Sequence, residues 1–382
     1  MPSLTHNTPA LRFPGYTGVW EQKQLEDVVT VYSGRDYKGI PAGNIPVYGT
    51  GGYMRSISQA LSDNNDAIGI GRKGTIDHPF ILKAPFWTVD TLFYCVPQHD
   101  YDLDFIYGLY QKVPWKALDE STGVPSLSKI AINHIKVLLP SLSEQRKIGS
   151  FFRHVDGLIN LHQRQTQTLK KLKQGLLQKM FPQDGESVPR LRFPGFTDTW
   201  EQHKLKEIAD FNPKSVLPEE FEYVDLQSVI GTSMVSHRTE TKQTAPSRAQ
   251  RLAQRGDVFF QTVRPYQKNN YLFSESHDNK NYVFSTGYAQ MRPHIDPHFL
   301  MSFLVTDNFV KTVVNNCTEG TYPAINSNDL SQLIISVPDT DEQQKIGSFF
   351  NKLDDLIHLH KQYVTTLIHL KKGLLQKMFP QD

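Results

Sequence analysis

Two short segments hold most of the side chains whose types and spacing could do chemistry. The first is AIGIGRKGTID at residues 67–77, where Gly69, Gly71 and Gly74 have the G-x-G-x-x-G spacing of a dinucleotide-binding loop. Such a loop needs a long helix directly after it, because the helix N-terminus holds the pyrophosphate. The residues that follow, TIDHPFILKAPFW, contain two prolines and strand-type residues, so no helix can begin there. The spacing therefore does not predict a nucleotide site.

What remains useful for chemistry in these segments is a set of basic, amide and aromatic side chains. The second segment is TVRPYQKNN at residues 262–270. Arg, Lys, Asn and Gln on turns are the side chains that reach base edges and phosphates of DNA. Charges on a loop are also commonly just solvated, and the first pair could cap a hairpin, so the clusters alone leave both interpretations open. The candidate side chains are Arg72, Lys73, Thr75, Arg264, Tyr266, Lys268 and Asn269.

A catalytic or metal-binding constellation is not recognisable in the sequence. The nearest approach to the tetrapeptide of an amino-methyltransferase is Asn212-Pro213-Lys214-Ser215, which lacks the second proline and the aromatic residue. The carboxylates of DEQQK at 341–345 recur only as SEQRK, which is typical of the start of a helix and not of a nuclease. Cys95 and Cys317 stand alone, which disfavours a zinc ribbon or a disulfide framework. We expect a binding protein with no metal site and no catalytic residue.

An internal repeat defines the organisation of the chain. LRFPGYTGVWEQKQL at 11–25 recurs as LRFPGFTDTWEQHKL at 191–205, and the 41 residues from 144 match those from 342 at 27 positions. The residues between these frames, 26–122 and 206–320, show almost no resemblance to each other. Duplication with divergent inserts favours two modules that do the same job on different targets over simple drift. Short runs such as NIPVYG, DAIGIG and DVFFQTV predict strands, and DFIYGLYQKV and HFLMSFLVTDNFVKTVV predict helices, so each module is an α/β or α+β globule.

The matched tails predict two long helices. Apolar residues advance by three and four along each tail and end at Phe-Pro, which predicts a coiled-coil seam of about 36 residues, roughly 55 Å long, that runs on through Leu172 and Leu370. We expect Ser143 and Asp341 to cap the helix starts, the seam histidines to fix register, and another backbone, from the partner helix or another subunit, to approach Gly175 and Gly373 closely. The seam residues are Ile148, Phe152, Val155, Ile159, His162, Leu169, Ile346, Phe350, Leu353, Ile357, His360 and Leu367.

The distribution of charge limits how the chain can bind nucleic acid. Residues 1–143 carry 12 basic and 13 acidic side chains, and residues 185–341 carry 15 and 19. The tails are basic, with net charges of +5 for 144–184 and +2 for 342–382. Because affinity for phosphates grows with the number of cationic contacts, the modules are poor candidates for tight nonspecific binding and would meet DNA through local clusters. The sequence shows neither a signal peptide nor a membrane-spanning run, so we expect a cytoplasmic protein.

The complete pattern resembles the specificity subunit of type I restriction-modification systems. The residues that carry the resemblance are LRFPG-[YF]-T-x-x-WEQ at both module starts, GNIPVYGTGG, DAIGIGRKGT and FWTVDTLFY in the first module, GDVFFQTVRP and FSTGYAQMRP in the second, and the paired EQ-x-KIGSFF tails. The resemblance implies an α/β (α+β) tandem repeat with two target recognition domains and an antiparallel coiled coil. It implies these boundaries: domain 1 at 1–143, helix 1 at 144–182, a linker at 183–190, domain 2 at 191–341 and helix 2 at 342–382.

The same resemblance implies a function without catalysis. Each domain would read one half of a bipartite, asymmetric DNA site, and the helices would set the spacing and dock two methyltransferase subunits, with restriction subunits added. S-adenosylmethionine, ATP and magnesium would then bind to these partners and not to this chain. The alternative is a coiled-coil scaffold that binds protein without DNA specificity. Besides the candidates above, the resemblance points to Ser121, Thr122, Thr321 and Tyr322, in matching loops ahead of Pro125 and Pro323, as DNA contacts.

Overall fold

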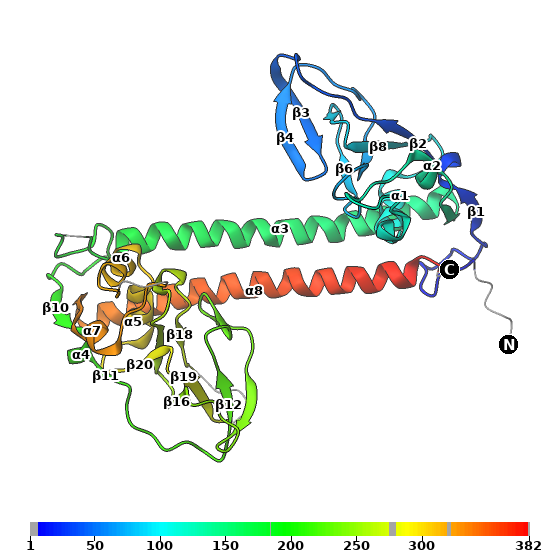
Figure 1. The fold of residues 1–382 in the computed structure, drawn as a ribbon. Helices are drawn as coiled ribbons and strands as arrows, with labels where there is room; N and C mark the ends of the chain where they lie inside the picture. Colours follow the sequence, from blue (N-terminus) through cyan, green and yellow to red (C-terminus); the bar gives the residue numbers. More distant parts are fainter. Residues whose placement is uncertain (1–6, 184, 275–279, 319–321, 381–382) are drawn as a thin grey trace. The chain divides into compact units, whose positions relative to one another are not determined.

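The long helices α3 (Leu142–Met180) and α8 (Thr340–Met378) each run for 39 residues (Figure 1). The computed structural model describes residues 7–183, 185–274, 280–318 and 322–380. The chain divides into two compact units, and each contains one module and a part of both helices. Among the described helices, none has both the length and the apolar character needed to cross a membrane. The first unit comprises residues 1–163 and 361–382, and the second comprises residues 164–360.

The first module is built from two small sheets and a joining strand pair (Figure 1). One sheet has the order β2-β8-β5-β6 with antiparallel neighbours, and the other has the order β4-β3-β7, in which β3 and β7 are parallel. Strands β1 and β9 pair antiparallel and bring the two ends of the module together. The elements are β1 (Glu21–Gln24), η1 (Leu25–Asp27), β2 (Val29–Ser33), β3 (Ala42–Gly49), β4 (Gly52–Ile57), β5 (Ala67–Gly71), β6 (Phe80–Leu82), β7 (Trp87–Thr88), β8 (Leu92–Pro97), α1 (Leu103–Tyr110), η2 (Trp115–Leu118), α2 (Lys129–Asn133) and β9 (Lys136–Leu139).

The second module repeats this topology with additions. Its sheets have the orders β11-β20-β17-β18 and β15-β12-β19-β16, where β12 and β19 are parallel, and β10 pairs with β21. The hairpin β13–β14, the edge strand β16 and the helix α6 have no counterpart among the described elements of the first module. The elements are β10 (Glu201–Lys204), α4 (Leu205–Ile208), β11 (Ala209–Phe211), β12 (Glu220–Val224), β13 (Val229–Ile230), β14 (Ser233–Met234), β15 (Arg238–Thr241), β16 (Ala249–Leu252), β17 (Val258–Gln261), η3 (Pro265–Gln267), β18 (Tyr271–Leu272), β19 (Tyr282–Ser285), β20 (Tyr288–Pro293), α5 (Pro297–Leu304), α6 (Asp307–Asn315), α7 (Ser327–Gln332) and β21 (Ile334–Val337).

The glutamate that opens each matched tail anchors the module start to the helix. Arg12 donates two hydrogen bonds of 2.6 Å to the buried carboxylate of Glu144. Arg192 donates bonds of 2.9 and 2.6 Å to Glu342, whose side chain has no exposed surface. Both carboxylates lie in the first turn of their helices, as the sequence predicted, and they are in addition buried partners of the LRFPG arginines. This pairing explains why both frames keep their sequence while the residues between them diverge.

A glutamine and a glycine that the two tails share dock a short helix of each module onto the long helix. The Gln145 Oε1 atom accepts a hydrogen bond from the Asp102 backbone N–H at 3.2 Å, and Gln343 accepts one from Asp296 at 3.1 Å. A Cβ atom on Gly149 would lie 2.2 Å from Asp102 Oδ1, so no side chain fits there. Gly347 faces Asp296 in the same way at 2.3 Å. Gly149 and Gly347 are thus required because α1 approaches α3, and α5 approaches α8, too closely for a side chain to fit between them.

The helix starts differ from the predicted caps. Helix α3 begins at Leu142 and α8 at Thr340, so Ser143 and Asp341 lie inside the first turn and cannot be N-caps. In α8 the Asp339 side chain accepts a hydrogen bond from the Glu342 backbone N–H at 2.9 Å. The cap prediction failed because one serine or aspartate in such a run cannot be distinguished from its neighbours by sequence.

Within each unit the two helices run antiparallel and are joined by an apolar seam and by an ion pair between a lysine and an aspartate. In the first unit Lys371 bonds to Asp156 at 2.6 Å, and His162 stacks on Tyr363 with ring centroids 4.9 Å apart. In the second unit Lys173 bonds to Asp354 at 2.6 Å. Leu172 and Leu370 are about half exposed, so the prediction that the seam continues through them is wrong. The next residues, Lys173 and Lys371, face the other helix instead. Buried seam residues are Ile148, Phe152, Val155, Ile159, Ile346, Phe350, Leu353 and Ile357, whereas His162, Leu169, His360 and Leu367 are partly exposed.

The Met-Phe-Pro end of each tail enters the core of a module. Phe379 packs against Trp20 and Phe105 of the first module at centroid distances of 6.1 and 5.2 Å. Phe181 packs in the same manner against Trp200 and Phe299 at 6.0 and 5.6 Å. Aromatic pairs in these arrangements stabilise beyond their buried area. The cores therefore include both ends of the repeated frame.

Candidate nucleic-acid interface

In the first module the loop after β5 holds the basic pair in an exposed turn. Arg72, Lys73 and Thr75 are exposed, and the Arg72 guanidinium donates to the Asp90 carbonyl oxygen at 3.4 Å and lies over the Phe93 ring, 5.8 Å from its centroid. No carboxylate among the described residues pairs with the Arg72 or Lys73 side chain. The turn therefore presents two uncompensated positive charges to solvent.

The glycines of this segment serve the fold of the turn. A Cβ on Gly71 would lie 1.9 Å from the Thr75 carbonyl oxygen, and Gly74 has a φ of +96°. Gly69 faces the Phe80 ring, with a Cβ distance of 3.2 Å. Strand β6 follows the turn, so no helix could hold a pyrophosphate. Gly69 and Gly71 are thus constrained by close neighbours within the protein, and Gly74 by its positive φ.

The second predicted loop of the first module lies beside this turn. The Gly74 N–H donates to the Pro125 carbonyl oxygen at 2.8 Å, and the Leu127 N–H donates to that of Arg72 at 2.9 Å. Asp119 organises the loop, because its Oδ1 atom accepts bonds from the Ser126 N–H and from the N–H and hydroxyl of Ser121. These hydrogen bonds lower the pKa of Asp119. Thr122 is exposed at the tip of the same loop.

In the second module the predicted arginine lies in the equivalent turn. Arg264 has a φ of +55°, and its N–H donates to the Pro323 carbonyl oxygen at 2.8 Å. Its guanidinium lies over the Tyr322 ring, 3.8 Å from the centroid. The structure thus brings together two residues that the sequence separates by 57 intervening positions. Thr321, predicted with Tyr322, lies outside the described residues.

The remaining candidates of the second module fall into two groups. Tyr266, at the tip of η3, is half exposed. Lys268 donates to Asp307 of α6, which lowers the pKa of that aspartate, and Asn269 accepts from the Gly231 N–H at 2.8 Å. Because both of these side chains bind protein groups, Arg264 and Tyr266 are the better-presented candidates.

Buried amides hold the backbone of this turn. From the sequence, Asn270 was counted in the cluster of side chains that could contact DNA, but it is buried, and Gln261 was given no role. The Asn270 Oδ1 atom accepts from the Gln261 N–H at 3.0 Å, and Gln261 Nε2 donates to Val263 O and to Gln267 Oε1. Gln261 and Asn270 are both nearly fully buried. A cluster of amides within QTVRPYQKNN was the available signal, since buried amides need partners that fix the surrounding backbone.

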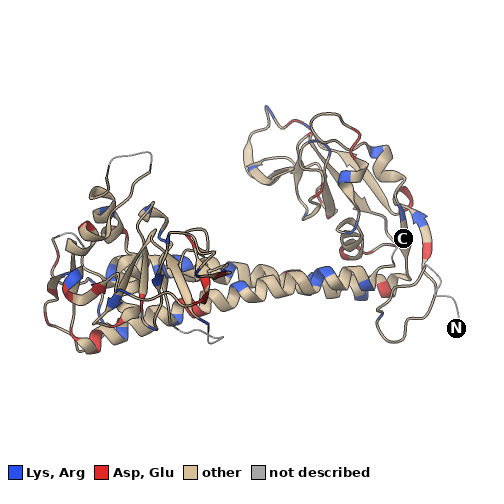
Figure 2. Cartoon of the chain, turned by 60° about the horizontal axis from the view of Figure 1, so that its bottom comes forward, with Lys and Arg blue, Asp and Glu red and all other residues tan. Residues whose placement is uncertain are grey.

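The hydrogen bonds place the two turns at the same point of the repeated fold. Thr262 N–H donates to Gly287 O as Arg72 N–H donates to Thr91 O, and Ile325 N–H bonds to Thr262 O as Leu127 N–H bonds to Arg72 O. Gly74 and Arg264 are therefore equivalent positions. Figure 2 shows the positions of Lys and Arg interspersed with those of Asp and Glu along the chain. Among the described residues, no carboxylate pairs with the side chains of Arg72, Lys73 or Arg264, whereas Lys268 pairs with Asp307.

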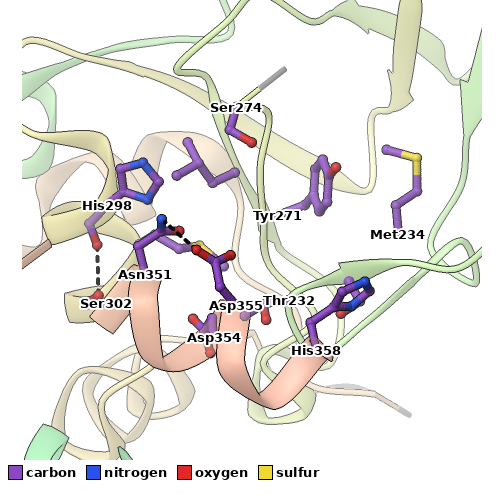
Figure 3. A pocket seen from close by; sticks show the side chains of 13 residues that line it. Thr232, Met234, Tyr271, Ser274, His298, Ser302, Asn351, Asp354, Asp355 and His358 are labelled. Carbon is purple, nitrogen blue, oxygen red and sulfur yellow. Dashed lines mark hydrogen bonds between the residues drawn. The ribbon is translucent and has the colours of Figure 1, made fainter. Parts of the chain in front are cut away.

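A cleft of about 360 Å³ lies between the second module and α8 (Figure 3). Several of its polar groups already have partners: Asn351 donates to Asp355 at 3.4 Å, Ser302 donates to the His298 carbonyl oxygen, and Asp354 binds Lys173. Among the residues the structure describes, no group of three or more His, Cys, Asp or Glu side chains is placed to hold a metal ion. The cleft gives no reason to assign a catalytic centre.

The repeated architecture corresponds to a known family of domains. The family model described as the type I restriction modification DNA specificity domain matches residues 18–171 and again residues 197–367. The chain belongs to this family. The match covers most of the chain and assigns one copy of the specificity domain to each half of the repeat, which agrees with the resemblance found in the sequence.

Named proteins similar to this chain are type I specificity subunits. The HindI specificity subunit of Haemophilus influenzae is 27% identical over 47% of this chain and 40% of its own length. The MjaVIII specificity subunit of Methanocaldococcus jannaschii is 24% identical over 72% of this chain and 68% of its own length. The matched region thus spans less than half of the first of these relatives.

A solved structure shares the fold. The S subunit of a type I restriction-modification system from M. genitalium superposes with a TM-score of 0.72 at 15% identity, covering 98% of this chain and 100% of that one. The tandem α/β modules with two long helices are therefore the fold of an S subunit, as the sequence predicted.

Proposed function

We propose that this chain is the DNA-recognition subunit of a type I restriction-modification complex, in which each module reads one half of a bipartite, asymmetric site. The observation that carries the proposal is the equivalence of Gly74 and Arg264. Both modules hold a turn at this point with the same backbone hydrogen bonds, yet the turns carry RKGT in one and RPYQK in the other. Different side chains on equivalent backbone turns are what two modules need if each recognises a different DNA sequence.

The reading residues in this proposal are those of the two turns and the loops beside them. In the first module Arg72, Lys73 and Thr75 contact DNA with Ser121 and Thr122. In the second module the contacts come from Arg264, Tyr266, Lys268, Asn269, Thr321 and Tyr322. What supports the pairing of turn and loop is their direct hydrogen bonding in both modules.

The long helices set the spacing between the two half-sites and dock two methyltransferase subunits in this proposal. Large apolar side chains remain exposed on the helices at positions related by the repeat, and such residues favour binding of another protein. Restriction subunits then join the complex. The exposed leucines are Leu158, Leu161, Leu172, Leu356, Leu359 and Leu370.

The chemistry belongs to the partner subunits. We propose that S-adenosylmethionine, ATP and magnesium bind to those subunits, that this chain is not catalytic, and that the complex works in the cytoplasm. The relatives' designation as specificity subunits supports this division of labour. It also explains why the repeated frames are dominated by packing residues.

Methylation mapping tests the proposal. DNA from a strain that expresses this chain with its partner subunits should carry one bipartite modified motif. Replacing residues 206–320 with those of a relative should change one half of the motif and leave the other half intact. A continuous motif, or a motif unchanged by the replacement, would show that the two-reader model is wrong.

The protein-binding scaffold is the second candidate, and the exposed leucines of the helices are the observation that favours it. A scaffold would assemble the same partners without affecting which DNA they modify. Binding of the assembled complex to DNA separates the two, because site-specific binding should weaken steeply with salt. Assembly without any site preference would favour the scaffold.

A further inference from the structure

The second module contains a basic segment that the two predicted clusters do not include. Residues 241–256, TKQTAPSRAQRLAQRG, carry one lysine and three arginines without any Asp or Glu. The domain around them, residues 185–341, is acidic overall, with 15 basic and 19 acidic side chains. Such a local concentration of positive charge in an acidic domain indicates a surface that meets an anion.

The segment contains β16, which lies at the edge of its sheet beside β19. Its start is bonded to the turn that holds the recognition loop: the Thr286 N–H donates to Arg248 O at 2.8 Å. The next residue, Gly287, accepts from the Thr262 N–H at 3.0 Å and from the Thr262 hydroxyl at 2.8 Å. Arg248 and the Arg264 loop therefore flank one two-residue turn.

Two arginines of this segment lack an acidic partner among the described residues. Arg248 is exposed, and its side chain forms neither an ion pair nor a hydrogen bond with any residue that the structure describes. Arg251 is partly buried, and its Nε atom has no hydrogen-bond partner. Burial lowers the pKa of Arg251, as expected for a guanidinium placed in protein without a counter-charge.

Other arginines of the module are engaged. Arg238 on β15 bonds to Asp225 and Glu240 at 3.1 and 2.9 Å. Arg292 on β20 holds the buried carboxylate of Asp257 with two bonds. These pairs satisfy the guanidinium groups of Arg238 and Arg292 within the fold, whereas Arg248 and Arg251 have no such pair among the described residues.

We propose that Arg248 and Arg251 bind phosphates of the DNA backbone next to the half-site read by the Arg264 loop. The inference rests on the proposed function and deepens it by assigning a positioning contact. Arg248 directly precedes the edge strand β16, and Arg251 lies within it at the register shift of its pairing with β19. Guanidinium groups match phosphate geometry. In the described part of the first module the equivalent sheet ends at β7, with no strand in the place of β16, so this contact belongs to the second half-site.

The salt dependence of DNA binding tests the proposal. The full chain, assembled with its methyltransferase subunits, is titrated by fluorescence anisotropy with a duplex containing the mapped site and with one lacking it, over a series of KCl concentrations. Arg248→Gln and Arg251→Gln should each reduce the slope of log K against log [KCl] by about 0.9 in magnitude. Both duplexes should lose affinity by the same factor, and the methylated motif should stay unchanged.

The controls separate a phosphate contact from other effects. Lys206→Gln removes an exposed cation on α4, which packs against β11 in the other sheet, and should leave the slope at the wild-type value. Arg248→Lys keeps the charge and should retain it too. Thermal unfolding midpoints equal to wild type exclude a folding defect, and Arg248→Gln, a change at an exposed side chain, tests the site if Arg251→Gln unfolds.

Two results would overturn the inference. Unchanged slopes in Arg248→Gln and Arg251→Gln would show that neither arginine meets a phosphate. Affinity lost only for the site-containing duplex would show that they read bases instead. If the wild-type complex shows no preference for its site, the proposed function itself fails, and that result is distinct from a change in slope between variants.

Discussion

Gly74 and Arg264 occupy the same position in the two modules, and both have a left-handed backbone, with φ of +96° and +55°. Each N–H donates to the carbonyl oxygen of a matching proline at 2.8 Å. This conformation costs a residue with a side chain about 1–2 kcal/mol, which glycine avoids. Retaining arginine at a position where the other module has glycine indicates that the side chain is needed there.

Arg264→Gly should therefore separate folding from recognition. Glycine removes the backbone strain, while the loss of stacking on Tyr322 and the greater flexibility of the unfolded chain act in the opposite direction. We expect a free energy of unfolding within about 1 kcal/mol of wild type, measured by denaturant titration. Affinity for the site should fall about tenfold or more, because a lost base contact costs about 1–3 kcal/mol.

The outcome in each module serves as the control for the other. Arg72→Ala should alter recognition of the first half-site alone, read by methylation mapping. Equal loss at both half-sites would indicate a folding defect. If Arg264→Gly unfolds the second unit at much lower denaturant, the arginine is a structural residue and the assignment of the turn is wrong.

The sequence was sufficient to predict the frame of the molecule. Repeated motifs separated by 180 and 198 positions fixed the tandem plan, and apolar residues at steps of three and four predicted both long helices. The prediction of the seam was wrong at Leu172 and Leu370, because a pattern of apolar residues does not indicate that a lysine faces the other helix. In the structure Lys173 and Lys371 point inward to aspartates of the other helix, and a leucine beside each is left exposed.

The candidate site could be predicted only as separate segments. Nothing in the sequence shows that Arg264 stacks on Tyr322 or that Lys268 is held by Asp307, because those contacts join residues that are distant along the chain. The glycines of AIGIGRKGT could be recognised in the sequence, but the contacts that require them could not. A Cβ on Gly71, for example, would collide with the Thr75 carbonyl oxygen. The spacing of a motif indicates which residues are constrained, whereas the cause of the constraint depends on which residues lie next to them in the folded chain.

The arginine of the second LRFPG motif should be among the most important residues for stability. Arg192→Ala leaves the fully buried carboxylate of Glu342 with only the Trp200 Nε1 donor at 3.1 Å. Removing one partner of a buried pair costs about 3–5 kcal/mol, so the unfolding midpoint of the full chain in urea should fall markedly. Arg190→Ala is the matched control, because its pair with Glu186 is at the surface and is worth at most about 1 kcal/mol. Similar midpoints for the two variants would contradict the anchoring role.

The helix glycines should respond to alanine in opposite directions. Gly149→Ala places a Cβ 2.2 Å from Asp102 Oδ1 and 2.7 Å from the Phe105 N atom, and such overpacking costs about 1–3 kcal/mol. A Cβ on Gly175 or Gly373 meets nothing within 4 Å, so the expected approach of the partner helix there is wrong. Gly175→Ala should stabilise the isolated chain by about 1 kcal/mol. If a partner subunit packs against Gly175, the same variant should weaken assembly, which co-purification of the methyltransferase subunits would measure.

Acid should weaken the second module through Glu222. Lys280, His237 and Thr239 donate to its buried carboxylate at 2.7, 2.7 and 3.1 Å, and these bonds, led by that from Lys280, lower its pKa from 4.5 to about 2. A group whose pKa is depressed by folding stabilises the native state above the unfolded value, so this contribution is complete above about pH 4.5 and is lost as the pH falls toward 2. We expect the urea midpoint of wild type to drop across that window and the drop to be smaller in Glu222→Gln, which is less stable at neutral pH. Glu219→Gln, whose contact with Lys242 is at the surface at 3.7 Å, should retain the wild-type pH profile. An equally steep acid loss in Glu222→Gln would assign the effect to other carboxylates.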